Sequence, residues 1–168
     1  MGDATEFTVK WGSRSISTYS VPGNTYEEVF KFFQNKKHKR EDWVKVTFSH
    51  SINMDVNKPP KEIWLKMAYT IEMPEWSKVS SQTAKAKTAW RTMVTAAKKH
   101  AQKHAALFED EVDKLCKATD KEADFRKWSG LYRQFAETLK KAHESYDSRS
   151  ANGEKEGVML PPPDKVKG

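Results

Sequence analysis

The sequence predicts an α+β domain in which a small antiparallel sheet, formed by the N-terminal half, packs against a long helical hairpin formed by the C-terminal half. Two observations carry this prediction. Apolar and polar residues alternate in two stretches before residue 74, and apolar residues recur every three or four positions in two stretches after residue 83. We therefore expect one domain at residues 1–150, followed by an irregular tail with Pro and Gly at residues 151–168.

The strands are predicted from short apolar or alternating stretches. Residues 7–11 and 16–21 predict two short strands, because Gly12 and Ser13 separate them. Residues 43–53 and 63–73 alternate strictly enough to place one apolar row on one face of each strand. We expect these last two strands to form a hairpin.

The helices are predicted from caps and from apolar periodicity. A short helix is expected to start after Asn24 or Thr25, since each is followed three residues later by a glutamate that can complete a capping box. A long helix is expected over residues 83–116, and Thr119 marks the break that follows it. Residues 125–146 carry the second helical stripe.

Composition excludes several classes of protein. The chain of 168 residues is 32% charged, with a mean hydropathy of −0.85, and it has no apolar run near the ~18 residues of a spanning helix. One cysteine, Cys116, excludes an internal disulfide framework and a Cys-rich zinc site. The first residues lack the basic-then-apolar segment of a signal peptide, so a cytoplasmic location stays open.

The net charge of +7 is concentrated in one segment. Residues 77–108 contain seven basic residues and no acid, so they alone account for this charge. The candidate binding patch is Lys85, Lys87, Arg91, Lys98, Lys99 and Lys103. It predicts a site for phosphate, an acidic surface or an acidic peptide, with a merely solvated helix face as the alternative. Nucleic acid is a weaker candidate, because lysine dominates and no known nucleic-acid-reading motif is present.

His100 and His104 are the strongest candidates for metal ligands. Four residues apart on a helix, they project from neighbouring turns on one side, which lets two imidazoles reach one zinc ion. In the pattern His-Glu-x-x-His, the glutamate is the general base that accepts a proton from the attacking water. Here Ala101 stands at that position, and its methyl group accepts no proton. The incidental occurrence of two histidines in a Lys-rich helix is the alternative.

A third ligand is not evident from spacing alone. His143, near the end of the second helical stripe, and His50, on a strand, could each complete a three-ligand site. The alternatives are an exposed helix-end histidine for His143 and a hydrogen-bonded, partly buried histidine for His50. Cys116 lies on the apolar side of its helix and is expected to pack as a small hydrophobe rather than act as a nucleophile.

Four stretches, in order, resemble a bacterial family of proposed secreted zinc-dependent proteases that is known mainly as a domain of unknown function. The first two are residues 19–25, Tyr-Ser-Val-Pro-Gly-Asn-Thr, and residues 71–76, Ile-Glu-Met-Pro-Glu-Trp. The third is Trp90 placed ten residues before His100, and the fourth is Tyr-Asp-Ser-Arg-Ser-Ala-Asn-Gly at residues 146–153. The resemblance covers roughly residues 16–160. It implies a zincin-like fold, zinc as cofactor and an exported or periplasmic location.

The sequence departs from this family at two positions that the resemblance marks as catalytic. Ala101 replaces the family's general-base glutamate, and Asn152 replaces a downstream histidine that is the family's third zinc ligand. Natural or introduced, these changes predict an impaired or inactive metallopeptidase scaffold. Asn152, Asp147 and His143 remain candidates for a further ligand or an outer partner of one. Asp147 could orient a ligating imidazole or simply cap the helix end.

These observations lead to a preferred function and two alternatives. The preferred interpretation is a degenerate member of the zinc protease family, with His100 and His104 as metal ligands. The first alternative is a non-catalytic module that binds a protein or peptide through its Lys-rich helix. The second is a non-specific nucleic-acid binder.

Overall fold

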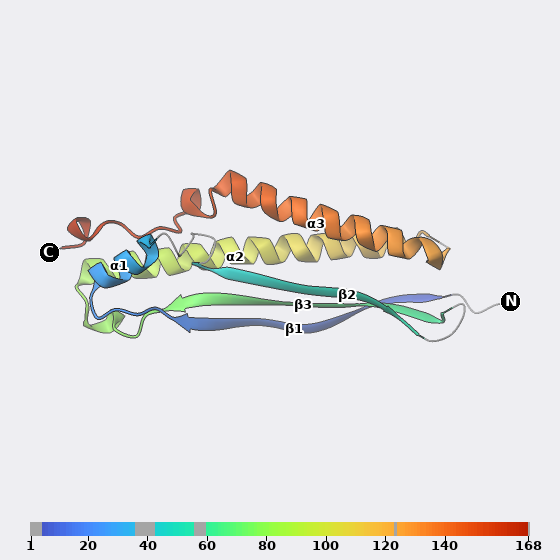
Figure 1. The fold of residues 1–168 in the computed structure, drawn as a ribbon, viewed down its shortest axis with the longest axis horizontal. Coiled ribbons are helices and arrows are strands. Elements are labelled where there is room, and N and C mark those ends of the chain that lie inside the picture. The colour runs from blue at the N-terminus through green and yellow to red at the C-terminus, as the bar shows by residue number, and fades with distance from the viewer. Residues whose placement is uncertain (1–4, 36–42, 56–59, 123, 168) are drawn as a thin grey trace. The chain divides into compact units, whose positions relative to one another are not determined.

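The computed structural model describes residues 5–35, 43–55, 60–122 and 124–167. Three strands and three α-helices account for most of them (Figure 1). Their bounds are β1 Glu6–Ser20, α1 Tyr26–Gln34, β2 Lys45–Met54, β3 Glu62–Glu75, α2 Ala84–Thr119 and α3 Trp128–Ser150. Single 3₁₀ turns lie at Val79–Ser81, Phe125–Lys127, Glu154–Glu156 and Pro163–Lys165. The fold class is α+β, as predicted, with a small sheet packed against long helices.

The sheet is mixed rather than wholly antiparallel. Its strand order is β1-β3-β2. The predicted hairpin of β2 and β3 is confirmed, since the Asp55 amide donates to the Glu62 carbonyl across its closed end. The first strand instead runs parallel to β3: Glu6 bonds to Lys61 at one end of β1, and Val21 bonds to Glu75 just after the other. A parallel neighbour needs a long connection, and here residues 21–61 supply it.

The two short strands predicted at residues 7–11 and 16–21 are a single strand, β1. Gly12 does not interrupt it. A Cβ built at Gly12 would meet Ala68 Cβ and Met67 O only at ordinary contact distances of 3.5 Å. Pairing with the 14-residue strand β3 therefore outweighs the local tendency of a Gly-Ser pair to break a strand.

Helix starts follow the predicted caps. The Glu28 amide donates to Thr25 Oγ1 at 3.3 Å, and Glu28 Oε2 accepts from the Asn24 amide at 2.6 Å, so α1 opens with a capping arrangement. The long helix α2 begins after Thr83, whose hydroxyl accepts from the Ala86 amide at 3.2 Å. It ends at Thr119, three residues beyond the predicted end, and α3 continues to Ser150.

The chain divides into two compact units, each containing parts of the sheet and of both long helices. Unit 1 comprises Met1–Ser15, Thr47–Thr70 and His104–Ser145. Unit 2 comprises Ile16–Val46, Ile71–Lys103 and Tyr146–Gly168. The predicted division into a domain at residues 1–150 and a tail at residues 151–168 stays a prediction.

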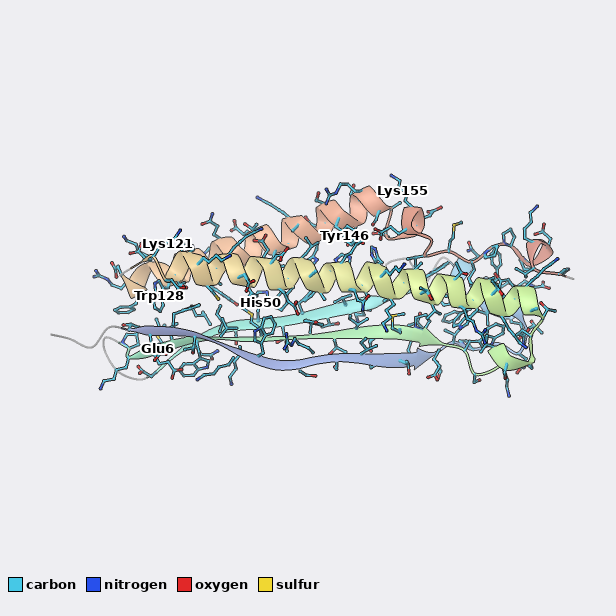
Figure 2. The ribbon with its side chains drawn as sticks, turned by 180° about the vertical axis from the view of Figure 1, so that it is seen from behind. Glu6, His50, Lys121, Trp128, Tyr146 and Lys155 are labelled. Atoms are coloured by element: carbon cyan, nitrogen blue, oxygen red, sulfur yellow. The ribbon has the colours of Figure 1, made fainter. Side chains whose placement is uncertain are left out.

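Unit 1 has an apolar core between β3 and the two long helices. Its buried members are Leu65, Met67, Phe108, Val112, Leu115, Phe135 and Leu139. Cys116 packs beside them, and burial, with nearby acidic groups, raises the pKa of its thiol, in line with its expected packing role. Figure 2 labels His50 on β2 and Trp128 at the start of α3.

Unit 2 has an aromatic core that also holds the C-terminal residues. Trp76 packs against Trp90 and Tyr26, with ring centroids 5.6 and 6.5 Å apart, and its indole donates to the Gly23 carbonyl at 2.8 Å. The Tyr26 hydroxyl donates to the Pro161 carbonyl at 2.8 Å. Val158, Leu160 and Val166 are buried. The predicted tail is therefore irregular in backbone but packed.

Across the residues described, no helix combines the length and apolarity needed to cross a bilayer.

Candidate metal centre

His100 and His104 lie one turn apart on the uninterrupted helix α2. Both are buried, with 5% and 8% of their surface exposed. Ala101 between them is fully buried and offers no polar atom. The helix thus presents two imidazoles to the protein interior without the acidic neighbour of the His-Glu-x-x-His pattern.

Asp147 on α3 supplies a carboxylate to this pair. Its Oδ1 lies 3.4 Å from His100 Nε2. The ligand atoms of His100, His104 and Asp147 all lie within 4.8 Å of one another, so these three residues could hold a metal ion. Zinc bonds imidazole nitrogen and carboxylate oxygen at about 2.0–2.2 Å, so two neighbouring ligand atoms of a tetrahedral site lie roughly 3.3–3.5 Å apart. The distance between His100 and Asp147 matches that edge.

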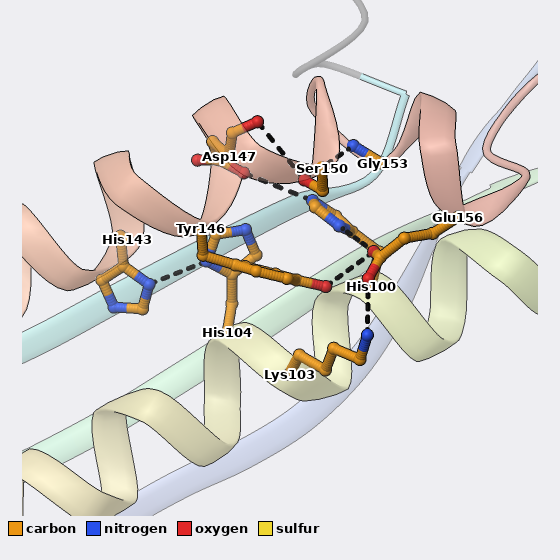
Figure 3. A network of polar contacts seen from close by, with 9 residues as sticks. All are labelled: His100, Lys103, His104, His143, Tyr146, Asp147, Ser150, Gly153 and Glu156. Carbon is orange, nitrogen blue, oxygen red and sulfur yellow. Dashed lines mark hydrogen bonds and ion pairs between the residues drawn. The ribbon is translucent and has the colours of Figure 1, made fainter.

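A second carboxylate holds the other side of the His100 ring. Glu156 Oε2 lies 2.9 Å from His100 Nδ1, and it also accepts a hydrogen bond of 2.7 Å from the Tyr146 hydroxyl. The other oxygen, Oε1, pairs with the Lys103 ammonium. Figure 3 shows the three donors converging on this one carboxylate.

Glu156 stays ionised in this setting. Its partial burial alone would raise its pKa, but the hydrogen bonds from Lys103, Tyr146 and His100 outweigh burial and lower the pKa to about 2. For Tyr146 the effects act together: burial raises the pKa of its phenol, and the hydrogen bond to the Glu156 anion raises it further. Tyr146 therefore remains a hydrogen-bond donor near neutral pH.

An ionised carboxylate only accepts hydrogen bonds, so it fixes the tautomer of His100. Nδ1 of His100 must carry the proton that Glu156 accepts. In the neutral ring, Nε2 is then an acceptor that faces Asp147 Oδ1 across 3.4 Å. A proton on either group or a bound metal ion can bridge two atoms at this distance.

Ring contacts restrict His100 directly and His104 through its neighbour His143. The His100 ring stacks on Tyr146, with centroids 4.9 Å apart and an interplanar angle of 24°. His104 Nδ1 lies 2.7 Å from His143 Nδ1, and the His143 ring stacks on Phe48 with centroids 4.6 Å apart. One imidazole of the His104–His143 pair must donate to the other, so His143 lies where an outer partner of His104 is needed.

The segment after α3 approaches His100 closely because Gly153 has no side chain. Gly153 adopts φ +83°, and a Cβ there would meet Val158 Cγ2 at 2.6 Å and His100 Cγ at 3.2 Å. Its amide donates to Ser150 Oγ at 3.1 Å. Asn152 has φ +51°, and its amide donates to the Asp147 carbonyl at 2.8 Å, which closes the end of α3. A role for the Asn152 side chain as ligand stays a prediction.

The predicted basic patch as a binding surface stays a prediction. Among its residues, Lys103 bonds Glu156, and the Lys85 ammonium reaches the Lys167 carbonyl at 3.4 Å. Arg91 and Lys99 line a groove together. The predicted third-ligand alternative His50 is bonded instead to the Tyr132 hydroxyl at 2.8 Å.

Sequence reasoning missed Glu156. It belongs to a Glu-Lys-Glu turn flanked by two glycines, a composition typical of a solvated loop. No local signal distinguishes it from Glu154, and only the folded chain brings it to His100.

The chain belongs to a bacterial family. Residues 16–156 match the family described as "Bacterial protein of unknown function (DUF922)". No curated protein matches the sequence, and no solved structure matches it either. The match includes every residue of the network in Figure 3.

Proposed function

We propose that this chain is a zinc-binding member of its family that no longer hydrolyses peptides. His100, His104 and Asp147 are the ligands, with Glu156 and His143 as their outer partners. The observation that carries the proposal is the position of His100 between two carboxylates, with Nδ1 facing Glu156 at 2.9 Å and Nε2 facing Asp147 at 3.4 Å.

The donor set suits zinc. Two imidazoles and one carboxylate form a known three-ligand set for zinc sites that keep an open position. A carboxylate that accepts from the second ring nitrogen of a ligating histidine fixes the ring and raises its basicity. Zinc, when bound in such sites, supplies Lewis acidity. The residues of this chain bind and orient the ion, exclude solvent from most of both imidazoles and hold the His100 proton at Nδ1.

Hydrolysis lacks its proton acceptor. The buried Ala101 methyl group replaces a general base, and Glu156, with a pKa of about 2, is too weak a base to replace it near neutral pH. The resemblance to zinc proteases therefore supports descent from an enzyme rather than current activity. Export from the cytoplasm, which the resemblance also implies, remains a proposal.

The metal proposal is tested by elemental mass spectrometry on protein purified without nickel resin, followed by competition against a chromophoric zinc chelator. We expect about one zinc per chain. Asp147→Asn should weaken zinc binding by at least tenfold, whereas Glu144→Gln, an equal charge change on α3, should leave it unaltered. Failure to bind zinc after it is offered, or equal affinity of Asp147→Asn and wild type, would contradict the proposal.

The loss of activity is tested separately by restoring both family residues. The double variant Ala101→Glu, Asn152→His should cleave an unstructured protein substrate in a chelator-sensitive manner, while the wild-type chain should not. Chelator-sensitive cleavage by the wild type would show that Ala101 does not abolish hydrolysis.

A further inference from the structure

The exposed side of α2 in unit 2 carries an open groove of about 430 Å³. One wall follows α2 and includes Thr88, Arg91, Thr92, Thr95 and Lys99. Glu156, from the turn after α3, is also part of the lining. The α2 part of the lining therefore lies within residues 77–108, the segment that accounts for the net charge of the chain.

The electrostatic field of the groove is positive. Arg91 and Lys99 make no hydrogen bond or ion pair with any other residue among those described. The single carboxylate of the lining is Glu156, and both of its oxygens are already bonded, one to Lys103 and the other to His100 and Tyr146. Arg91 and Lys99 are thus available to bind an anion, because the Glu156 carboxylate is already paired with the Lys103 ammonium.

The length of the α2 segment in the lining matches that of a short extended peptide. Residues 88–99 of α2 span about 16 Å at 1.5 Å per residue, which equals roughly five residues of extended peptide at 3.3 Å each. Thr92 and Thr95 lie between Arg91 and Lys99 and offer hydroxyl groups along the same path. Hydroxyl groups and cationic side chains are therefore distributed along a stretch of α2 as long as a short extended peptide.

We propose that this groove binds an extended acidic peptide segment of a partner protein, with Arg91 and Lys99 pairing with its carboxylates. The lining contains no aromatic side chain on which a nucleobase could stack, and such stacking contributes strongly to the binding of single-stranded nucleic acid. An acidic peptide is thus favoured over a nucleic acid. None of the groove's lining residues is a proposed metal ligand, although Glu156 also contacts His100, so binding of a peptide through Arg91 and Lys99 does not require zinc.

The test is fluorescence anisotropy with a labelled hexapeptide of alternating Glu and Gly. A Gln-Gly peptide of equal length and a single-stranded DNA hexamer serve as comparison probes. The double variant Arg91→Glu, Lys99→Glu should bind the acidic peptide at least tenfold more weakly than wild type. The control variant Lys66→Glu, Lys121→Glu makes the same charge change at exposed lysines of unit 1 and should bind within twofold of wild type.

Several results would overturn the proposal. These are no detectable binding of the acidic peptide, equal binding of the Gln-Gly peptide, tighter binding of the DNA, or equal losses in the groove and control variants. The same titration in a chelator and with Asp147→Asn separates this site from the metal centre. Peptide binding should be unchanged in both, so a failed zinc site and a failed peptide groove give different results.

Discussion

The carboxylate of Glu156 lies 2.9 Å from Nδ1 of His100, although 56 residues separate them in the sequence. This contact decides which ring nitrogen carries the proton and leaves Nε2 facing Asp147. The Tyr146 hydroxyl and the Lys103 ammonium hold the carboxylate in place. These contacts hold Nδ1 of His100 toward Glu156, so Nε2 is the ring nitrogen on the side of Asp147, the other carboxylate of the proposed site.

Replacing this carboxylate is the first prediction. Glu156→Gln removes the anion that fixes His100, and losing such an outer partner typically costs 10–100-fold in metal affinity. We expect zinc affinity to fall by about tenfold or more. In the metal-free protein, ¹⁵N NMR of the imidazole should show a smaller share of the tautomer protonated at Nδ1.

Glu154→Gln is the matched control for this prediction. Glu154 lies in the same 3₁₀ turn and carries the same charge, whereas the 2.9 Å contact with His100 Nδ1 is made by Glu156. It should change neither the zinc affinity nor the tautomer. If Glu156→Gln behaves like Glu154→Gln in both measurements, Glu156 does not orient His100.

Local patterns were sufficient to predict one half of the site. The spacing of His100 and His104 placed both on one face of the expected helix over residues 83–116. The capping pair at the start of α1 and the β2–β3 hairpin were equally local. Each depends on residues a few positions apart, where helix and strand geometry fix the outcome.

The other half of the site depends on contacts between distant segments. The role of Glu156 arises only when the turn after α3 meets α2, and nothing in its neighbourhood in sequence marks it. The parallel pairing of β1 is similar, because a crossover connection leaves no turn signal of the kind that marks a hairpin. For Asp147 the sequence left open whether it orients an imidazole or caps a helix, and its 3.4 Å distance from His100 supports a role at the imidazole.

Gly153 provides the second prediction. Gly153→Ala places a Cβ in a left-handed conformation, which costs about 1–2 kcal/mol, and it drives that atom to within 2.6 Å of Val158 Cγ2. Overpacking adds about 1–3 kcal/mol. We expect the free energy of unfolding to drop by roughly 2–5 kcal/mol in urea denaturation, and zinc affinity to fall because the His100 ring must shift.

Gly157→Ala separates these two costs. Gly157 also has a left-handed backbone, with φ +92°, but the nearest atom to a built Cβ is Ala96 Cβ at 3.5 Å. The free energy of unfolding of Gly157→Ala should therefore fall only by the cost of the left-handed backbone, about 1–2 kcal/mol, with no loss from overpacking. Equal losses in the two variants would mean that the close approach at Gly153 contributes nothing.

A third glycine should respond in the opposite direction. Gly130 lies near the start of α3, and a Cβ built there has no heavy atom within 4 Å. Gly130→Ala lowers the backbone entropy of the unfolded chain without a steric cost, so we expect a gain of about 0.5–1 kcal/mol in the free energy of unfolding. Urea denaturation measures it, and a loss of stability would show that this site is more crowded than the contacts indicate.

His50 should make stability depend on pH. Its imidazole is packed among the rings of Tyr132, Phe108 and Phe135 in unit 1, and burial lowers its pKa below 6.5. As the pH falls below 6.5, the unfolded chain takes up a proton that the folded chain resists, so stability falls until the folded pKa is passed. His50→Gln should reduce the loss in free energy of unfolding between pH 7.5 and pH 5.

The control variant is Tyr132→Phe, which keeps the buried imidazole. It should retain that loss in free energy of unfolding, because burial rather than the 2.8 Å hydrogen bond to Tyr132 lowers the pKa of His50. Equal pH dependence in His50→Gln and wild type would assign the effect to other groups.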